Sequence, residues 1–489
     1  NTNADVWRLY FFNRFSVSEI YDFSPVRSAL FEDAAWPTIV ILYSNNKNKN
    51  FEYFSINSKE FSKRFNSFSV TQQSIKEFSQ KEIQQFNKQY NWFWKTMLYG
   101  SFFDFLIIKR LKAQFRTIFD YIEEYGLQYG VGLKRVDGKK KPDATNLIGH
   151  KFIDTQKKEL QQFIYNSSSD WQEETVGNIP QKDVNNFPVL FTPPLALIKE
   201  GLTPDIKGVA AFCNEKVVFT HSVRAIKGRK EDTDILKSIV GLVNSDLFSY
   251  YILHTGSSVG IDLTRANQIE QFSFPVVLSK EIVDIVDSIS NIDITSFSYN
   301  QERSKLINAL NQKIFNLYRL TQLEKDFIDY TVNYVSKTLK HTDRKRINRS
   351  DELDGYKNVF LNYFSDHNLP FKISYYLYRE FIGIFFEQNN ESTCRVVENS
   401  DIRKILYLYG NLSIEQISKQ IFLQKNVIEI LPDKTGSCII KINNAENWQS
   451  ANAWLDLVGF VKDMIAPDKA IYEIYENIYK EQINQTTPL

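Results

Sequence analysis

The sequence IVGLVNSDLFSYYILHTGSSVGIDLTRANQIEQFSFPV, residues 239–276, decides how the middle of the chain folds. Residues 233–253, which overlap the first part of this stretch, carry apolar side chains at helical spacing. This pattern predicts one amphipathic helix. The residues on its apolar face are Ile235, Ile239, Leu242, Val243 and Leu247. Glycine and serine follow over 256–260 and predict a tight turn, and 272–277 predict a short strand that contains a proline.

Outward from this stretch, strand and helix patterns alternate. Residues 186–201 (NFPVLFTPPLALIKEG) and 209–228 (VAAFCNEKVVFTHSVRAIKG) alternate apolar with polar side chains, which favours strands. Residues 305–339 predict two helices that part at Thr321, which has the position of an N-cap with Glu324 as its capping-box partner.

Two further regions complete the pattern. Residues 71–125 show helical periodicity that Gly100 interrupts, so a pair of buried helices is predicted there. The last third mixes the two kinds of element. Its expected strands are 373–378, 381–386 and 438–442, and its expected helices are 413–421 and 450–464. The chain as a whole is therefore predicted to have a mixed α+β, multidomain fold.

Near the start, residues 20–23 and 38–43 (TIVILY) predict two strands, which could pair as a hairpin. The second is continuous in apolar residues, which is typical of a strand buried on both faces. A hairpin alone is marginally stable in water, so we expect this segment to dock on another part of a protein. The chain is thus expected to begin near the end of a domain.

Charge and cysteine content exclude several classes of protein. Among 489 residues, Lys and Arg number 59 and Asp and Glu number 58, so any nucleic-acid surface must be a local patch. The three cysteines and five histidines are scattered, which excludes a disulfide framework and a zinc module of closely spaced ligands. No Ser/His/Asp or Cys/His pairing and no cluster of carboxylates indicates a catalytic or metal site.

The most apolar region is 92–119, but Lys95, Asp104, Lys109 and Arg110 interrupt it. The apolar runs between these charges are much shorter than the roughly 20 residues that span a bilayer. The start of the chain lacks the pattern of a secretory signal. We therefore expect a soluble, cytoplasmic protein with no membrane partner.

The first basic cluster places five positive charges within eight residues of a glycine-containing segment. Its members are Lys134, Arg135, Lys139, Lys140 and Lys141. Such a loop can neutralise phosphates and gain affinity by releasing counterions. The alternative is a solvated surface loop, which a charge run equally favours.

The second basic cluster follows a predicted strand and comprises Arg224, Lys227, Arg229 and Lys230. Arginine in such a loop can reach guanine edges or phosphates. The alternative is a charged turn that Glu231 and Asp232 partly neutralise.

Three further candidates lie in or beyond the small-residue turn. Ser257 and Ser258 bring backbone amides close to a partner such as a phosphate, and Arg265 could reach the same group. A plain tight turn is an equally good interpretation. Asn244 and Ser245 inside the predicted helix are interpreted as structural. A third basic cluster, HTDRKRINR over 341–349, favours a solvated linker over a contact to DNA or a subunit.

Four stretches, in this order, resemble the C-terminal, target-recognition half of the gamma-class N6-adenine DNA methyltransferases. This family includes type IIG restriction–modification enzymes, TaqI-like methylases and phage-defence methylases. The stretches are IYDFSPVRSALFEDAAWPTIVILY (20–43), WKTMLYGSFFDFLIIKRL (94–111), the stretch 239–276, and IFNLYRLTQLEKDFI (314–328). The third carries the Asn-Ser pair, the SSxxG turn and the proline-containing strand of the family, and is the strongest.

The resemblance implies double-stranded DNA as a partner, together with a catalytic methyltransferase half or another defence-system subunit. The parent enzyme would transfer a methyl group from S-adenosylmethionine to an adenine amine. The family's glycine-rich cofactor turn and its Asn/Asp-Pro-Pro-aromatic motif are both missing here. Thr192-Pro193-Pro194-Leu195 offers neither the amide or carboxylate nor the aromatic ring that hold a flipped adenine. We therefore expect no catalytic, cofactor-binding or metal site in this chain, with S-adenosylmethionine bound only in the assembled or full-length enzyme.

Five parts are expected along the chain. They are 1–44, the last strands of a methyltransferase-like domain; 45–175, a helical connector with a basic loop; 176–300, a target-recognition domain; 301–350, a helical hairpin; and 351–489, a C-terminal α+β module. The implied function is DNA binding and target recognition within a restriction–modification or phage-defence system. The alternative is a non-catalytic scaffold or specificity subunit that recruits partner proteins.

Overall fold

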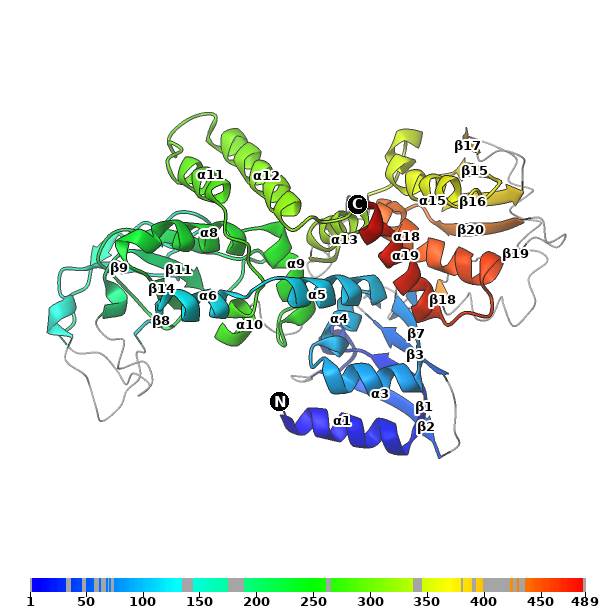
Figure 1. Ribbon diagram of the computed structural model, residues 1–489, viewed down its shortest axis with the longest axis horizontal. Coiled ribbons are helices and arrows are strands. Elements are labelled where there is room, and N and C mark those ends of the chain that lie inside the picture. Colours follow the sequence, from blue (N-terminus) through cyan, green and yellow to red (C-terminus); the bar gives the residue numbers. More distant parts are fainter. Residues whose placement is uncertain are drawn as a thin grey trace. The chain divides into compact units, whose positions relative to one another are not determined.

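The structure is a computed structural model that divides the chain into two compact units. Unit 1 comprises Asn1–Leu106 and Thr321–Leu489, and unit 2 comprises Ile107–Leu320. The residues that the structure describes are 2–31, 37–45, 50–56, 61–62, 67–68, 70–71, 74–133, 144–174, 189–260, 265–336, 345–379, 381–388, 393–398, 423–424, 429–430 and 436–486. Both units mix helices with small sheets, which confirms the predicted α+β, multidomain fold (Figure 1).

The first sheet of unit 1 has the order β2-β1-β3-β7. Its strands are β1 (Ser16–Asp22), β2 (Ile39–Ser44), β3 (Asn50–Ser55) and β7 (Ile75–Ser79). β1 pairs antiparallel with β2, with Ile20 opposite Ile41, so the predicted hairpin partners are confirmed. β1 pairs in parallel with β3 on its other side.

The TIVILY strand is not buried on both faces within the part of the chain that the structure describes, so the cover that its apolar run predicts is not seen there. β2 lies at the edge of the sheet, and Ile39 and Tyr43 are 48% and 54% exposed. The apolar run gives the strand its β-propensity, but a strand is buried on both faces only where other elements cover it. β2 thus presents apolar side chains, with no charge among them, at an edge of the sheet.

Helices pack on this sheet through aromatic side chains. They are α1 (Thr2–Arg14), α3 (Gln80–Gln89), α4 (Phe93–Tyr99) and the start of α5 (Phe102–Gln114), whose residues from Ile107 on belong to unit 2. A short α2 (Arg27–Leu30) follows β1. Ser79 starts α3 with a capping box to Glu82. Gly100 ends α4, as the sequence predicted. Phe78 from the sheet lies 5.1 Å from Phe102 between ring centroids, so ring packing joins strand to helix.

The C-terminal part of unit 1 has a sheet of order β17-β15-β16-β20-β19. β15 (Phe371–Leu377), β16 (Phe381–Gln388) and β20 (Gly436–Ile442) confirm the three predicted strands, and β17 (Thr393–Glu398) and β19 (Glu429–Ile430) flank them. Helices α13 (Gln322–Tyr330), α15 (Asp354–Asp366), α18 (Ser450–Phe460) and α19 (Ile471–Thr486) belong to the same part. Short pairs β4 (Phe61–Ser62) with β5 (Ser67–Phe68) and β6 (Val70–Thr71) with β18 (Leu423–Gln424) complete unit 1. The predicted helix 413–421 lies outside the described residues.

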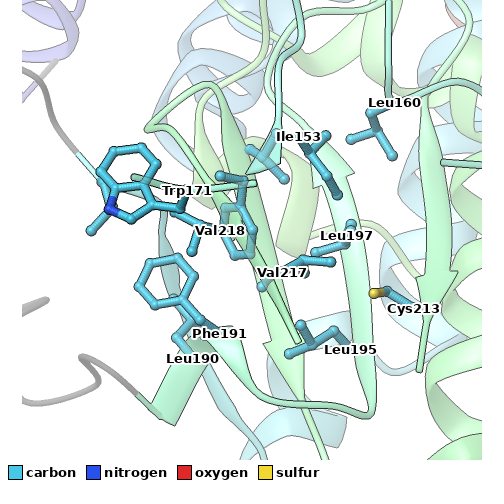
Figure 2. Packing of buried hydrophobic residues seen from close by; sticks show 14 of the residues in the cluster. Ile153, Leu160, Trp171, Leu190, Phe191, Leu195, Leu197, Cys213, Val217 and Val218 are labelled. Carbon is cyan, nitrogen blue, oxygen red and sulfur yellow. The ribbon is translucent and has the colours of Figure 1, made fainter. Parts of the chain in front are cut away.

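Unit 2 is built on two small sheets. β12 (Ala210–Cys213), β11 (Leu195–Lys199), β14 (Val223–Lys227) and β8 (Gln128–Val131) form the first, in that order. β10 (Ser169–Asp170), β9 (Lys151–Ile153) and β13 (Val217–Phe219) form the second. Figure 2 shows the apolar core that the strands share, with Val217 and Leu197 near its centre and Trp171 at one side. This core fixes the first sheet, on which the candidate residues lie.

Helices of unit 2 surround this core. They are α6 (Ile118–Tyr125), α8 (Thr233–Val243), α9 (Asp246–Thr255), α10 (Gln268–Phe272), α11 (Lys280–Ser290) and α12 (Tyr299–Leu317). α8 packs on β11 and β12, and α11 packs between α8 and α12 (Figure 1). The apolar face of α8 therefore covers the sheet directly.

Two predictions about the stretch 239–276 need correction. The helix 233–253 is two helices, because Ser245 caps α9 by accepting a hydrogen bond from the Phe248 amide and so ends the first helix. The strand 272–277 is not a strand. Asn267 caps α10, which ends at Phe272, and only Pro275 makes an isolated bridge, to Thr117. Proline lacks the amide that a ladder needs, which limits pairing at this point.

The predicted cap at Thr321 is confirmed. Its hydroxyl accepts a hydrogen bond from the Glu324 amide, and the Glu324 carboxylate accepts one from the Thr321 amide. One turn further along α13, Asp326 accepts hydrogen bonds from the Trp454 indole (2.9 Å) and the Gln322 amide (2.8 Å). Burial raises the pKa of Asp326 to about 6, although both hydrogen bonds act in the opposite direction.

We predict that Asp326→Asn stabilises unit 1 at neutral pH. A carboxyl group whose pKa is raised on folding contributes stability at low pH and loses it as pH rises from about 4 to about 6. Removing the charge should recover about 1–2 kcal/mol at neutral pH, less than two full pKa units would give because the side chain keeps some contact with water. Thermal unfolding across this pH range should show a flatter profile for the variant. Identical profiles for the two proteins would contradict the assignment.

We also predict that Ile39→Lys reduces aggregation of the chain without unfolding it. Ile39 is half exposed on an uncharged edge strand, and lysine at such an edge disfavours strand-to-strand association. The matched control is Ile20→Lys on the neighbouring strand, because Ile20 is 4% exposed and a charge there should unfold the sheet. Light scattering and thermal unfolding measure the two effects. A large loss of stability in Ile39→Lys would mean that β2 is covered.

Candidate nucleic-acid interface

The pairing of three antiparallel strands sorts the candidate residues to two opposite ends of one sheet. β11 runs antiparallel to β14, with Leu195 opposite Lys227 and Lys199 opposite Val223. β8 runs antiparallel to β14 as well. One end, which we call the Pro194 end, therefore holds the start of β11 and the end of β14. The other, the Gly201 end, holds the end of β11, the start of β14 and the end of β8.

Lys227 lies at the Pro194 end, and its side chain makes hydrogen bonds within unit 2. Its ammonium group donates hydrogen bonds to the backbone carbonyls of Thr192 and Pro193, each at 2.9 Å. The same carbonyls belong to the Thr-Pro-Pro-Leu segment. Leu195 of that segment starts β11 and is fully buried in the core, so the segment serves as a strand entry.

Arg229 and Lys230 also lie at the Pro194 end. The Arg229 guanidinium donates to Asp232 at 3.1 Å and lies 3.3 Å from Glu231, and the hydrogen bond to Asp232 raises the pKa of Arg229. Lys230 is exposed. The two carboxylates thus neutralise much of this turn, as the alternative interpretation of the second basic cluster expected.

Arg224 occupies the start of β14, at the Gly201 end, but its side chain is buried. Only 4% of the residue is exposed, and its guanidinium donates to Ala266 O (3.0 Å), Gln271 Oε1 (2.6 Å) and Glu200 Oε1 (3.2 Å). Burial lowers the pKa of this arginine, partly offset by Glu200. A guanidinium held by three internal acceptors cannot reach a phosphate or a base. We therefore leave Arg224 out of the DNA-contacting set.

Arg265 lies at the Gly201 end with an exposed side chain. Its backbone makes a bridge with Gly201, just beyond the end of β11. Ser257 and Ser258 are exposed as well, and Glu270 accepts hydrogen bonds from the Ser257 amide (2.8 Å) and hydroxyl (2.6 Å). The structure thus brings three predicted candidates into one neighbourhood, built from the turn after α9 and the start of α10.

Sequence patterns gave no indication of several further polar groups at this end. Ser222 joins a hydroxyl cluster, 2.8 Å from Thr155 and 3.0 Å from Thr220 between oxygen atoms. His221 is exposed beside it. Isolated serine and threonine residues carry little sequence signal, because only the pairing of distant strands brings them together. The run Thr220-His221-Ser222 directly before a strand is the one clue that could have been followed.

Leu133, the residue before the first basic cluster, lies at the same end. The Leu133 amide donates to Phe219 O (2.8 Å), and the His221 amide donates to Leu133 O (2.9 Å), so Leu133 is fixed beside His221. Lys134, Arg135, Lys139, Lys140 and Lys141 come next along the chain and lie outside the described residues. The segment that carries them thus leaves the described structure at the Gly201 end.

Carboxylates balance the described cations at the Gly201 end. Glu200 pairs with Arg224, and Glu270 lies close enough to interact electrostatically with the same guanidinium. Glu200 directly precedes Gly201, the bridge partner of Arg265. Any strong attraction for polyanions would have to come mainly from the cluster 134–141, since each neutralised phosphate adds to affinity.

Asn244 and Ser245 have structural roles, as expected. Asn244 makes two hydrogen bonds to the backbone of Ala210, accepting from its amide (3.0 Å) and donating to its carbonyl (2.8 Å). In the third basic cluster, Arg349 pairs with Asp351 at 2.5 Å on the surface of unit 1, while 341–344 lie outside the described residues.

A small cavity in unit 1 is too small for a nucleoside-sized cofactor. It has a volume of about 60 Å³ and is lined by polar groups of Lys76, Ser101 and Asp456 among apolar neighbours. Pockets for small-molecule ligands usually measure about 300–1,000 Å³.

In the part of the chain that the structure describes, no three His, Cys, Asp or Glu side chains are grouped to hold a metal. Among the same residues, no helix is long and apolar enough to cross a membrane.

Comparisons with known proteins give weak structural similarities. No protein-family model matches the chain, and no curated protein matches it in sequence. The type IIG restriction endonuclease BpuSI is 8% identical with a TM-score of 0.25, over 65% of this chain and 46% of the enzyme. The type IIL restriction–modification enzyme MmeI, in a complex with DNA, is 12% identical with a TM-score of 0.36, over 69% of this chain and 48% of the enzyme. The chain thus spans less than half of each enzyme, and similarity this low carries no conclusion about its activity.

Proposed function

We propose that unit 2 binds duplex DNA at the Gly201 end of its first sheet. The observation that carries this proposal is that exposed Arg265 and Ser258 lie at the same end as Leu133, the residue before the five cations of the first basic cluster. Ser257 is left out, because its amide and its hydroxyl both donate to Glu270. Arginine, serine hydroxyls and backbone amides are the groups that most often contact phosphates. The near-zero net charge of the chain fits a local patch better than general attraction.

We further propose that this binding serves target recognition in an S-adenosylmethionine-dependent N6-adenine DNA methyltransferase of a restriction–modification or phage-defence system. The support is the order of four family-like stretches in the sequence, of which 239–276 supplies Ser258 and Arg265. The catalytic part would bring the cofactor and hold the flipped adenine. This chain would position that part on its DNA site.

A scaffold or specificity subunit that recruits proteins is the second candidate. The exposed apolar strand β2 favours it, together with helix α1, where Trp7 and Tyr10 are more than half exposed. Contiguous exposed apolar side chains of this kind usually mark a contact with another protein. In this function the chain would bind a partner through unit 1 and would not need to bind DNA.

We predict that replacing Lys139, Lys140 and Lys141 by alanine weakens binding to all duplex sequences alike. Each lost phosphate contact should reduce the slope of log affinity against log salt by about 0.9, so the triple variant should lose up to about three units. A gel-shift series across salt concentrations, with a mixed-sequence duplex, measures this change.

Arg229→Ala is the matched control for this experiment. It removes an exposed cation from the Pro194 end, where two carboxylates already pair with it, so affinity and slope should stay unchanged. If the triple variant behaves like this control, the DNA face lies elsewhere. If no duplex binds even at low salt, the scaffold function replaces the one proposed.

We also predict that the purified chain neither binds S-adenosylmethionine at micromolar concentration nor methylates DNA. Its sequence lacks the glycine-rich turn and the Asn/Asp-Pro-Pro-aromatic motif, and Thr-Pro-Pro-Leu enters a buried strand instead. Titration calorimetry measures the first part, and incorporation of labelled methyl groups the second. Saturable binding would place a cofactor site within these residues.

A further inference from the structure

Burying the charged side chain of Arg224 costs free energy, and its contacts indicate what role the charge has. A buried ion carries a desolvation penalty of several kcal/mol unless its partners compensate it closely. Glu200 is the acidic partner, and its side chain is 27% exposed, so water still screens part of the pair. The other two acceptors, Ala266 O and Gln271 Oε1, are neutral. An apolar side chain could fill this position at lower cost if packing alone were required.

The contacts of Arg224 join the sheet to one particular segment. The Arg224 side chain extends from β14 and its guanidinium donates to Glu200, just after the end of β11. It also donates to Ala266 and Gln271, the two ends of the segment 266–271. The planar fork of arginine presents several donors in fixed directions, which lysine cannot do. One side chain thus fixes this segment at both of its ends.

Further hydrogen bonds make the attachment tighter. The Ala266 amide donates to Glu200 O at 3.2 Å, and the Gln271 side chain donates to Lys199 O at 3.0 Å. Glu270, within the same segment, accepts both hydrogen bonds from Ser257. The turn after α9 and the residue preceding Ala266 are therefore held through one network that has Arg224 at its centre.

We propose that Arg224 is a positioning residue for Arg265. Arg265 directly precedes Ala266, whose carbonyl Arg224 holds, and its own side chain is exposed. A cation on a fixed backbone loses less conformational entropy when it binds a phosphate than a cation on a loose loop. This role rests on the proposed DNA face, and it gives the buried arginine an effect on DNA binding without any contact to DNA.

Four variants of the full chain test this role, with a mixed-sequence duplex as the probe. Arg265→Ala removes the phosphate contact itself. Arg224→Lys keeps the charge but cannot reach all three acceptors. Gln271→Met removes one acceptor of Arg224 and keeps the side-chain volume. This variant tests the same role if Arg224→Lys does not fold. The fourth is the double variant Arg224→Lys with Arg265→Ala, which measures whether the two residues act together.

We expect Arg265→Ala to lower affinity about 3–10-fold and the salt slope by about 0.9. Arg224→Lys and Gln271→Met should each lower affinity by a similar factor, and Arg224→Lys should add little once Arg265 is alanine. Leu195→Ala controls for stability, because it opens a buried site at the Pro194 end and should lower the melting temperature without changing DNA affinity in the folded protein.

Two results overturn the role of Arg224. In the first, Arg265→Ala weakens binding while neither Arg224→Lys nor Gln271→Met does. This result supports the DNA face but contradicts the positioning role of Arg224. The same holds if the losses from Arg224→Lys and Arg265→Ala multiply in the double variant, because independent sites add in free energy. If Arg265→Ala leaves both affinity and slope unchanged, the proposed DNA face itself is wrong, and the positioning role falls with it.

Discussion

The antiparallel pairing of β11 with β14 is the constraint on which the candidate interface depends. It places Lys199 opposite Val223 and Leu195 opposite Lys227, and so assigns each loop to one end of the sheet. Side chains that are close in sequence are thereby separated. Arg224 and Arg229 are five positions apart, yet one lies in the network at the Gly201 end and the other in a neutralised turn at the Pro194 end. The second basic cluster of the sequence therefore does not form one basic patch on the surface.

Local signals in the sequence predicted local structure well. Thr321 with Glu324, and Gly100 after α4, act through hydrogen bonds or backbone freedom within a few residues, and both were predicted correctly. The strands β15, β16 and β20 were predicted from their apolar patterns. The break at Ser245 was missed, because an amphipathic pattern runs on across it and only the cap shows where the first helix stops.

Burial could not be predicted in the same way, because it depends on partners that are distant in sequence. TIVILY has the composition of a central strand but lies at an edge, while Arg224 has the composition of a surface contact but is buried. In both cases the residue type gave the local tendency correctly, namely a strand and a cation. Whether water reaches the side chain depends on what packs beside it, and for Arg224 that is the segment 266–271.

The two units present surfaces with different binding chemistry. The Gly201 end offers an exposed arginine and hydroxyl groups, so the proposed binding of DNA there would depend on charge and weaken with salt. Strand β2 offers Ile39, Val40, Leu42 and Tyr43 without a charge, so association there depends on apolar burial and backbone pairing, which salt does not weaken. Edge strands of stable proteins usually carry a lysine, a proline or a cover that prevents pairing. Neither a lysine nor a proline lies within Ile39–Ser44, so β2 is better suited to a protein contact than to nucleic acid. The two proposed functions therefore depend on different residues, which can be tested one at a time.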